Sequence, residues 1–421
     1  MSAVGVIIAV SGGAESGVAA AIDAHPRLAV ARRCADVAEA IGAAAAGVGG
    51  AVVLSDQPRL SRAVVAALID TGVVLVGVAA APEPAEQLRA LGIETVAAPG
   101  WTDDEIALLV ADRLAHAARR PPSRESARAE RAEGQESADR DGQVIAVWGP
   151  TGAPGRTTIA VNLAAELARS GTSTLLIDAD TYGGAVAQAI GMSDEVPGLA
   201  GVIREAQHGS VDAAILARHA VTAAEGLSVL TGITRAGRWT EIAPAALEEV
   251  LRAARHTADA VVIDCGFGLE ADEELQYDTR APQRNGATLT ALSAADQVIA
   301  VGSAEPLGIQ RLIHGLDAVR SVAAHPLVVV NRVRAQVAGP RPAEAVADVL
   351  ARFAEVDRIT PVPWDPAPCD AAALEGRVLA ECAPRSKARR AIAGIASALA
   401  LGADAGSTPR RSRALAAAVK D

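Results

Sequence analysis

Short apolar runs alternate with helix-like stretches along the first quarter of the chain. Between the runs, apolar residues recur at helical spacing, as around 35–46, 60–70 and 84–91. Strands that alternate with helices predict a parallel sheet covered by helices on both faces. The predicted strands are residues 5–10, 28–32, 50–55, 73–78 and 94–99.

The same alternation returns from residue 144 onward, with longer helices. Its apolar runs are nearly continuous, which is typical of parallel strands buried on both faces. The pattern therefore predicts a second α/β domain with a mostly parallel sheet flanked by helices. Its predicted strands are 144–148, 173–180, 227–232, 260–266, 297–303 and 326–333, and its predicted helices are 158–169, 244–257, 307–323 and 343–354.

A polar stretch separates the two alternating regions. Residues 118–142 are dense in charge, Pro, Ser and Gly and contain almost no large apolar residue, so they cannot bury enough surface to fold alone. We therefore expect one domain over 1–117, a disordered linker over 118–142, a second domain over 143–402 and a flexible basic tail over 403–421.

Composition narrows the classes of function. A formal net charge of −11 argues against non-specific DNA binding. The four cysteines are scattered without a CxxC pair, so neither a zinc site nor a disulfide framework is indicated. The sequence shows no secretory signal and no run of about 18 apolar residues, and we expect a cytoplasmic protein.

The loop after residues 144–148 carries the first candidate chemistry. It reads GPTGAPGRTT and leads into a helix pattern, which is the layout of a phosphate-binding loop. Backbone N–H groups of such a loop and the helix dipole attract phosphate oxygens. Gly155 and Thr157 fit the Walker pattern, whereas Pro150 and Arg156 replace its Gly and Lys. A glycine-rich strand-to-helix turn without a ligand is the alternative.

Three acids follow predicted strands of the second domain. Asp178 and Asp180 end one strand and Asp264 ends another. Ligands of open α/β sheets sit beyond the carboxyl ends of the strands, so these acids should share a rim with the loop. There they could hold Mg²⁺ or position a water, although a single Asp could equally cap a helix. Asn331 ends a later strand and suits an adenine edge or a turn.

The first domain resembles a response-regulator receiver domain. Asp56 falls where that family keeps its phosphoacceptor, but the supporting residues are replaced by Ser-Gly-Gly at 11–13, Ala-Ala at 79–80 and Ala-Pro at 98–99. We expect a degenerate receiver that serves protein–protein contact, with Asp56 as a solvated carboxylate rather than a phosphorylated one.

The second domain resembles the ParA/MinD superfamily of deviant-Walker ATPases. With the receiver-like domain in front, the chain is similar to the CpaE/TadZ branch and, within it, to the actinobacterial septum-site-determining group. The motifs that carry this resemblance are GPTGAPGRTT (149–158), LLIDAD (175–180), VVIDCGFG (261–268), VVVNRV (328–333), PVPWD (361–365) and APRSKARRAI (383–392).

The resemblance implies ATP and Mg²⁺ as cofactors and a homodimer on ATP binding. Carried over by position, the phosphate loop is Gly152, Ala153, Gly155, Arg156, Thr157 and Thr158. Thr157 and Asp264 match the Mg²⁺ ligands, and Asp178 and Asp180 match catalytic switch acids, with Asp180 nearer the attacking water. Asn331 and Pro363 match the adenine pocket.

Departures from the family pattern predict slow hydrolysis. The signature lysine, which reaches the phosphates of the partner subunit, falls on the neutral Thr151. Arg156 keeps a charge but is bulkier than lysine, and Pro154 stiffens the loop. Residues 267–286 form a polar insertion, either a partner-responsive loop or a disordered surface loop, and its Arg284 is a candidate for supplying the missing charge.

The resemblance thus implies an ATP-binding spatial regulator of the MinD/CpaE type, acting in septum-site determination or cell division. A non-hydrolysing pseudo-ATPase scaffold for a pilus or secretion system is one alternative, and a ParA-like DNA segregation protein is another. A protein partner is expected at the receiver-like domain. The tail is too weakly apolar for firm membrane anchoring, so any recruitment to the inner face of the membrane or to the septum is peripheral.

Overall fold

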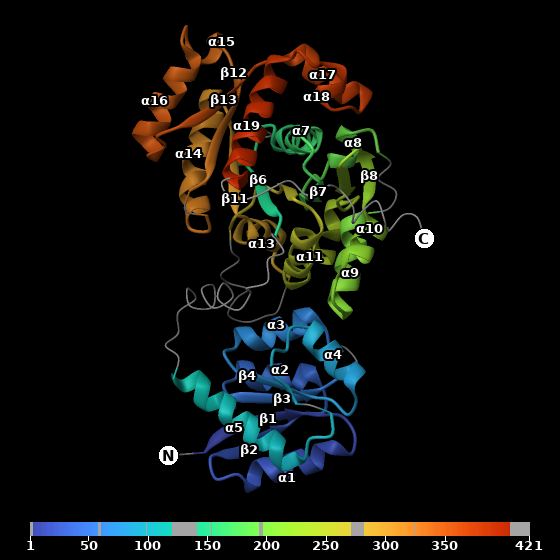
Figure 1. Ribbon diagram of the computed structural model, residues 1–421. Helices are drawn as coiled ribbons and strands as arrows, with labels where there is room; N and C mark the ends of the chain where they lie inside the picture. Colours follow the sequence, from blue (N-terminus) through green and yellow to red (C-terminus); the bar gives the residue numbers. More distant parts are fainter. Residues whose placement is uncertain are drawn as a thin grey trace. The chain divides into compact units, whose positions relative to one another are not determined.

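Two sheets form in the computed structural model, one parallel and one mostly parallel, each in one of two units of the chain (Figure 1). The first unit consists chiefly of residues before 140 and the second chiefly of residues from 140 onward. The structure describes residues 3–57, 60–97, 99–119, 141–152, 154–192, 197–270, 282–323 and 325–404. Most of the predicted linker, the tail from 405 onward, Ala98, Ala153 and residues 271–281 lie outside the described residues.

The first unit contains the five predicted strands in one parallel sheet. Its elements are β1 (Val4–Ala9), α1 (Ala14–Ala24), β2 (Leu28–Arg33), α2 (Val37–Ala45), β3 (Ala51–Ser55), α3 (Arg62–Asp70), β4 (Val74–Val78), α4 (Pro82–Ala90), β5 (Val96–Ala97) and α5 (Asp103–Arg119). The strand order is β2-β1-β3-β4-β5, which is the order of flavodoxin-like doubly wound sheets.

Alternation along β1 shows how the first sheet is covered on both faces. Val6 and Ile8 pack with residues of α1 and α5, whereas Ile7 and Ala9 pack with residues of α2, α3 and α4. Successive side chains of a strand point to opposite faces, so a strand made entirely of apolar residues needs helices on both sides.

The second unit contains all six strands predicted for it. Its elements are β6 (Gln143–Trp148), α7 (Arg156–Arg169), β7 (Thr174–Ala179), α8 (Val186–Ala189), α9 (Gly198–His208), α10 (Ala213–His219), β8 (Val221–Ala224), β9 (Leu227–Leu230), η1 (Ala236–Glu241), α11 (Pro244–Thr257), β10 (Ala260–Cys265), α13 (Gly286–Ala294), β11 (Gln297–Ser303), α14 (Pro306–Arg320), β12 (Leu327–Val333), α15 (Ala335–Ala338), α16 (Pro342–Ala354), β13 (Ile359–Pro363), α17 (Pro366–Glu375), α18 (Leu379–Cys382) and α19 (Lys387–Asp404).

Two edge strands extend the second sheet beyond the prediction. The order is β13-β12-β11-β6-β10-β7-β9-β8, and every neighbouring pair is parallel except β8 with β9. β8 and β13 were missed because neither is a continuous apolar run. The side chains of β8 are exposed, and β13 carries two prolines, which an edge strand tolerates.

Helices α7 and α19 pack side by side against one face of the second sheet (Figure 1). The buried Glu166 of α7 accepts two hydrogen bonds from Arg389 of α19, at 2.6 Å from Nε and 3.0 Å from Nη2. Such a bidentate, charge-assisted pair fixes the helices in both position and rotation. It thereby joins the C-terminal part of α7 to the first turn of α19.

Strands β6, β10 and β7 are neighbours, and their carboxyl ends form one rim. β10 lies between the other two, and its register places Asp264 opposite Val147 on one side and Asp178 on the other. The prediction that the loop and the three acids share a rim is therefore confirmed by the topology. Among the described residues, no helix has the length and apolarity that crossing a bilayer requires.

Candidate functional site

The loop between β6 and α7 has the backbone of an anion-binding turn. Gly152 and Gly155 adopt left-handed φ angles of 104° and 101°, which side chains rarely allow. Gly155 precedes the first turn of α7 and supplies no side-chain cap. N–H groups of that first turn have no partner within the helix, so they are available to an anion.

Arg156 folds back onto the loop that it follows. Its Nη1 donates to the carbonyl oxygens of Gly149 at 2.9 Å and Pro150 at 3.1 Å, and its Nη2 lies 3.3 Å from Oδ2 of Asp180. Its Nε is buried and has no hydrogen-bond partner in the described part of the chain. The loop cation is therefore present at the site and fixed by the loop itself.

Asp264 is the most deeply buried acid at this rim. Its Oδ2 accepts a hydrogen bond of 2.7 Å from the hydroxyl of Thr157, and its Oδ1 is buried with no partner among the described residues. Burial, followed by the charge of Asp178, raises the pKa of the Asp264 carboxyl well above its usual range. The orphaned oxygen marks a position where a cation would relieve an electrostatic cost.

Asp178 holds the segment that follows β7. Its carboxylate accepts hydrogen bonds from the backbone N–H of Asp180 at 3.2 Å and of Val186 at 3.1 Å. Burial raises its pKa to about 7, and the nearby charge of Asp180 adds to the rise. A Cβ at Gly184 or at Gly232 would collide with this carboxylate, so both glycines are required by close packing.

Asp180 faces the loop cation. Besides its contact with Arg156, its Oδ1 accepts hydrogen bonds from the N–H groups of Tyr182 at 2.9 Å and Gly183 at 3.2 Å. The structure thus brings Arg156, Thr157, Asp178, Asp180 and Asp264 together, as the sequence predicted.

The protein groups present fit Mg²⁺ in the form that accompanies a nucleotide. No group of three or more His, Cys, Asp or Glu side chains in the described ranges could hold a metal by itself. Mg²⁺ characteristically takes one or two protein ligands and completes its shell with phosphate oxygens and water. The Thr157 hydroxyl and the orphaned oxygen of Asp264 are ligands of this kind.

Asn331 holds the loop from its other side. Its Nδ2 donates to the carbonyl oxygen of Pro154 at 2.8 Å, and its Oδ1 accepts from the N–H of Arg332 at 2.8 Å. A Cβ at Gly155 would collide with the same amide. Pro363 ends the neighbouring strand β13, opposite Val333. The adenine contacts of Asn331 and Pro363 remain predictions.

The remaining loop residues occupy less informative positions. Thr158 is exposed, and its carbonyl oxygen accepts a hydrogen bond of 2.9 Å from Asn162 one turn later. Ala153 lies outside the described residues.

Aromatic rings that the sequence analysis did not single out lie around Arg284, the candidate that it named for supplying the missing charge. The rings of Tyr182 and Phe267 are 4.4 Å apart, and the Arg284 guanidinium lies 3.7 Å from the Tyr182 ring and 5.2 Å from that of Trp239. Arg284 also donates to the hydroxyl of Thr181 at 2.8 Å. The scarcity of aromatics, 2% of the chain, was the signal that could have drawn attention to these rings.

Ser11 and Ser55, which follow or end β1 and β3, line a hollow of the first unit together with Asp103. The residues at the end of β1 and β3 are linked by a hydrogen bond of 2.8 Å from the N–H of Ser11 to the hydroxyl of Ser55. Hydroxyl and glycine positions there offer no carboxylate pair for Mg²⁺.

Comparison with known proteins finds a family model that matches most of the second unit and two relatives that resemble part of the chain. The model of the CobQ/CobB/MinD/ParA nucleotide binding domain matches residues 145–376, which is more than half of the chain. An uncharacterized ATP-binding protein of Methanocaldococcus jannaschii is 28% identical over 259 residues, covering 61% of this chain and 86% of that protein. The sporulation initiation inhibitor protein Soj of Bacillus subtilis is 28% identical over 190 residues, covering 44% of this chain and 67% of Soj.

A solved structure shares the fold. The septum site-determining protein MinD of Pyrococcus horikoshii, complexed with Mg-ADP, aligns with a TM-score of 0.50 at 21% identity, covering 63% of this chain and 99% of that one. At this identity the likeness concerns the fold, which is the helix-flanked parallel sheet described above.

Proposed function

The chain belongs to the CobQ/CobB/MinD/ParA family of nucleotide-binding domains, and from this premise we propose that it binds ATP with Mg²⁺ and dimerises when it does so. The observation that carries the proposal is the Thr157–Asp264 pair, with its orphaned carboxylate oxygen, beside the uncapped N-terminus of α7. These groups offer an anion site and a cation site next to each other, as a metal–nucleotide complex requires.

Each residue of the site has a separate task in this proposal. N–H groups of the loop and of the first turn of α7 bind phosphate oxygens. Thr157 and Asp264 would hold Mg²⁺, which when bound neutralises charge on the phosphates. Asp180 lies at the rim to accept a hydrogen bond from an attacking water, and Asp178 keeps the Asp180 segment in position through its two backbone contacts.

Hydrolysis is proposed to be slow. Thr151 carries no charge, and the Arg156 guanidinium already donates hydrogen bonds to two loop carbonyl oxygens and to Asp180. Developing negative charge during phosphoryl transfer needs preorganised positive groups. The long-lived ATP-bound dimer would then be the signal, and the receiver-like unit would recruit a protein partner.

The biological role proposed is spatial regulation of the CpaE/TadZ type, in septum-site determination or cell division. The receiver-like strand order of the first unit and the family of the second unit support this combination. A non-hydrolysing scaffold is the second candidate, and the closure of Arg156 onto Gly149 and Pro150 favours it. Peripheral membrane contact through the tail depends on residues outside the described part of the chain.

Equilibrium titration with labelled ATP tests the proposal directly. We expect saturable binding of one ATP per chain that weakens strongly when EDTA removes Mg²⁺. Arg169→Ala, at the far end of α7, is the matched control and should bind as the wild type does. Absence of binding at millimolar ATP would instead support the scaffold.

Incubation with acetyl phosphate tests whether the first unit can be phosphorylated at Asp56. Because no acidic pair accompanies Asp56, we expect no added phosphate by intact-mass measurement after incubation with acetyl phosphate and Mg²⁺. A stoichiometric adduct that disappears in Asp56→Asn would show that the unit is a working receiver.

A further inference from the structure

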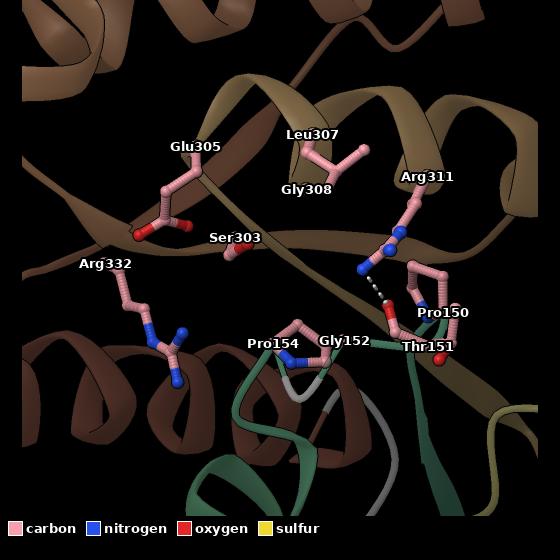
Figure 2. Close-up of a pocket in the computed structure, with 10 residues that line it drawn as sticks. All are labelled: Pro150, Thr151, Gly152, Pro154, Ser303, Glu305, Leu307, Gly308, Arg311 and Arg332. Atoms are coloured by element: carbon pink, nitrogen blue, oxygen red, sulfur yellow. Dashed lines mark hydrogen bonds between the residues drawn. The ribbon is translucent and has the colours of Figure 1, made fainter.

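A cavity of about 320 Å³ lies between the phosphate loop and the start of α14 (Figure 2). Thr151, Gly152 and Pro154 line it from the loop, and the turn from Ser303 to Gly308 lines it from the other side. None of the three rim acids lines it. Its volume is at the lower end of the range for pockets that bind small molecules.

Arg311 reaches from α14 to the loop at this cavity. Its Nη1 lies 3.4 Å from the carbonyl oxygen of Thr151, as the dashed line in Figure 2 marks. A Cβ at Gly152 would collide with the same nitrogen, so the left-handed glycine also leaves room for this guanidinium. The charge missing from the side chain at Thr151 is therefore present next to it in space.

Arg332 enters the cavity from the end of β12. Its φ of 58° is left-handed, a conformation that costs free energy in a residue with a Cβ. The hydrogen bond from its N–H to Oδ1 of Asn331 supports this geometry. Figure 2 shows its guanidinium on the same side of the cavity as Glu305. Residues held in such a backbone geometry cluster at active sites and ligand clamps.

The lining of the cavity carries more positive than negative charge, from Arg311 and Arg332 against Glu305. Its one acid, Glu305, lies 2.8 Å from Nη1 of Arg334, which does not line the cavity. Within the ranges that the structure describes, neither Arg311 nor Arg332 has a carboxylate partner: Arg311 contacts the Thr151 carbonyl oxygen, and the Arg332 guanidinium lies 5.8 Å from the Trp364 ring. Backbone N–H groups of the first turn of α14, at Leu307 and Gly308, add partial positive charge.

We propose that this Arg311–Arg332 cavity is a second phosphate-binding site, separate from the nest of the phosphate loop. Two planar guanidinium groups and a helix N-terminus suit a tetrahedral group with several acceptor oxygens. Two sources present that chemistry, a free phosphorylated small molecule or the nucleotide held by a second copy of the chain. Binding of the second copy's nucleotide rests on the proposed function, whereas binding of a free phosphorylated molecule does not.

Titration with inorganic pyrophosphate tests the cavity itself. The full chain carrying Arg156→Ala is used as background, so that the phosphate loop contributes little. In that background, adding Arg311→Ala or Arg332→Gly should weaken pyrophosphate binding by about tenfold, the effect of one charge-assisted contact. Glycine suits the left-handed backbone at 332, and Arg311→Lys, which keeps the charge, should recover part of the affinity.

A control variant separates the cavity from net charge. Arg218 is exposed on α10, so Arg218→Ala in the same background removes an equal charge elsewhere and should leave pyrophosphate binding unchanged. If Arg311→Ala and Arg218→Ala bind pyrophosphate equally well, the cavity is not a phosphate site and the proposal is wrong.

Sedimentation with saturating Mg-ATP distinguishes the two sources. Here the otherwise wild-type chain is compared with Arg311→Ala. Loss of pyrophosphate binding without loss of the ATP-dependent dimer assigns the cavity to a free phosphorylated molecule, whereas loss of both assigns it to the nucleotide of a second copy. A wild type that binds no ATP would refute the proposed function and leave the pyrophosphate result valid.

Discussion

Asp264→Asn is expected to stabilise the nucleotide-free protein and to abolish Mg²⁺-dependent ATP binding. The wild-type carboxylate is fully buried with one oxygen unpaired, so its charged form is costly in the folded state. Asparagine keeps an oxygen for the Thr157 hydroxyl and removes the charge. We expect about 1–3 kcal/mol of added unfolding free energy at pH 8, measured by thermal and denaturant unfolding without nucleotide.

The gain from Asp264→Asn should grow as the pH rises. A carboxyl whose pKa is raised in the folded state stabilises the fold below its unfolded value and loses that contribution as the pH rises toward the folded value. The pKa of Asp264 is raised well above its ordinary value by burial, so its charged form costs stability increasingly as the pH rises above that ordinary value. The variant should therefore show a flatter stability profile from pH 5 to 8.

Thr157→Val is the matched comparison for Asp264→Asn. Valine has nearly the shape of threonine but removes the hydrogen bond to Asp264, leaving that carboxylate without either partner. Both variants should lose Mg²⁺-dependent binding, yet Thr157→Val should destabilise the nucleotide-free protein. If the two variants shift stability in the same direction, the buried carboxylate is not the source of the cost.

The arrangement of the site was largely predictable because strand ends are fixed by topology. A buried parallel strand must end at the rim, so Asp178 and Asp264 followed from the apolar runs before them. The phosphate loop followed in the same way from β6, its glycines and the start of α7. These inferences needed only the order of elements and the period of the apolar pattern.

Contacts between distant segments could not be read from the sequence. The cavity joins the loop to Arg311, 160 positions later, and Arg332 points there through a left-handed backbone that no local pattern signals. The Arg284 guanidinium likewise reaches Thr181 across 103 positions and lies over the ring of Tyr182. Side chains of this kind are placed by the packing of whole elements, and a charge on an exposed helix looks the same whether it faces solvent or a cavity.

The second large effect is expected for Arg156→Ala, which should weaken ATP binding by roughly tenfold to a hundredfold. The loss corresponds to a charge-assisted phosphate contact of about 1.5–3 kcal/mol. Titration of the variant with labelled ATP and Mg²⁺ measures it, with Arg169→Ala as the control for charge on α7. Equal binding by the wild type and Arg156→Ala would mean that the phosphate site has been assigned to the wrong residue.

Arg156→Lys separates the charge of Arg156 from its geometry. In the nucleotide-free protein the guanidinium bridges the carbonyl oxygens of Gly149 and Pro150 and the carboxylate of Asp180, which a single ammonium cannot do in the same fork geometry. If those contacts only stabilise the empty loop, lysine should bind ATP at least as tightly as arginine, because it has less to give up. If they position the loop for phosphate, lysine should bind ATP less tightly than arginine but more tightly than alanine. Only the positioning role predicts that Arg156→Lys binds ATP less tightly than the wild type. The order of the three ATP affinities therefore decides whether Arg156 stabilises the empty loop or positions it for phosphate.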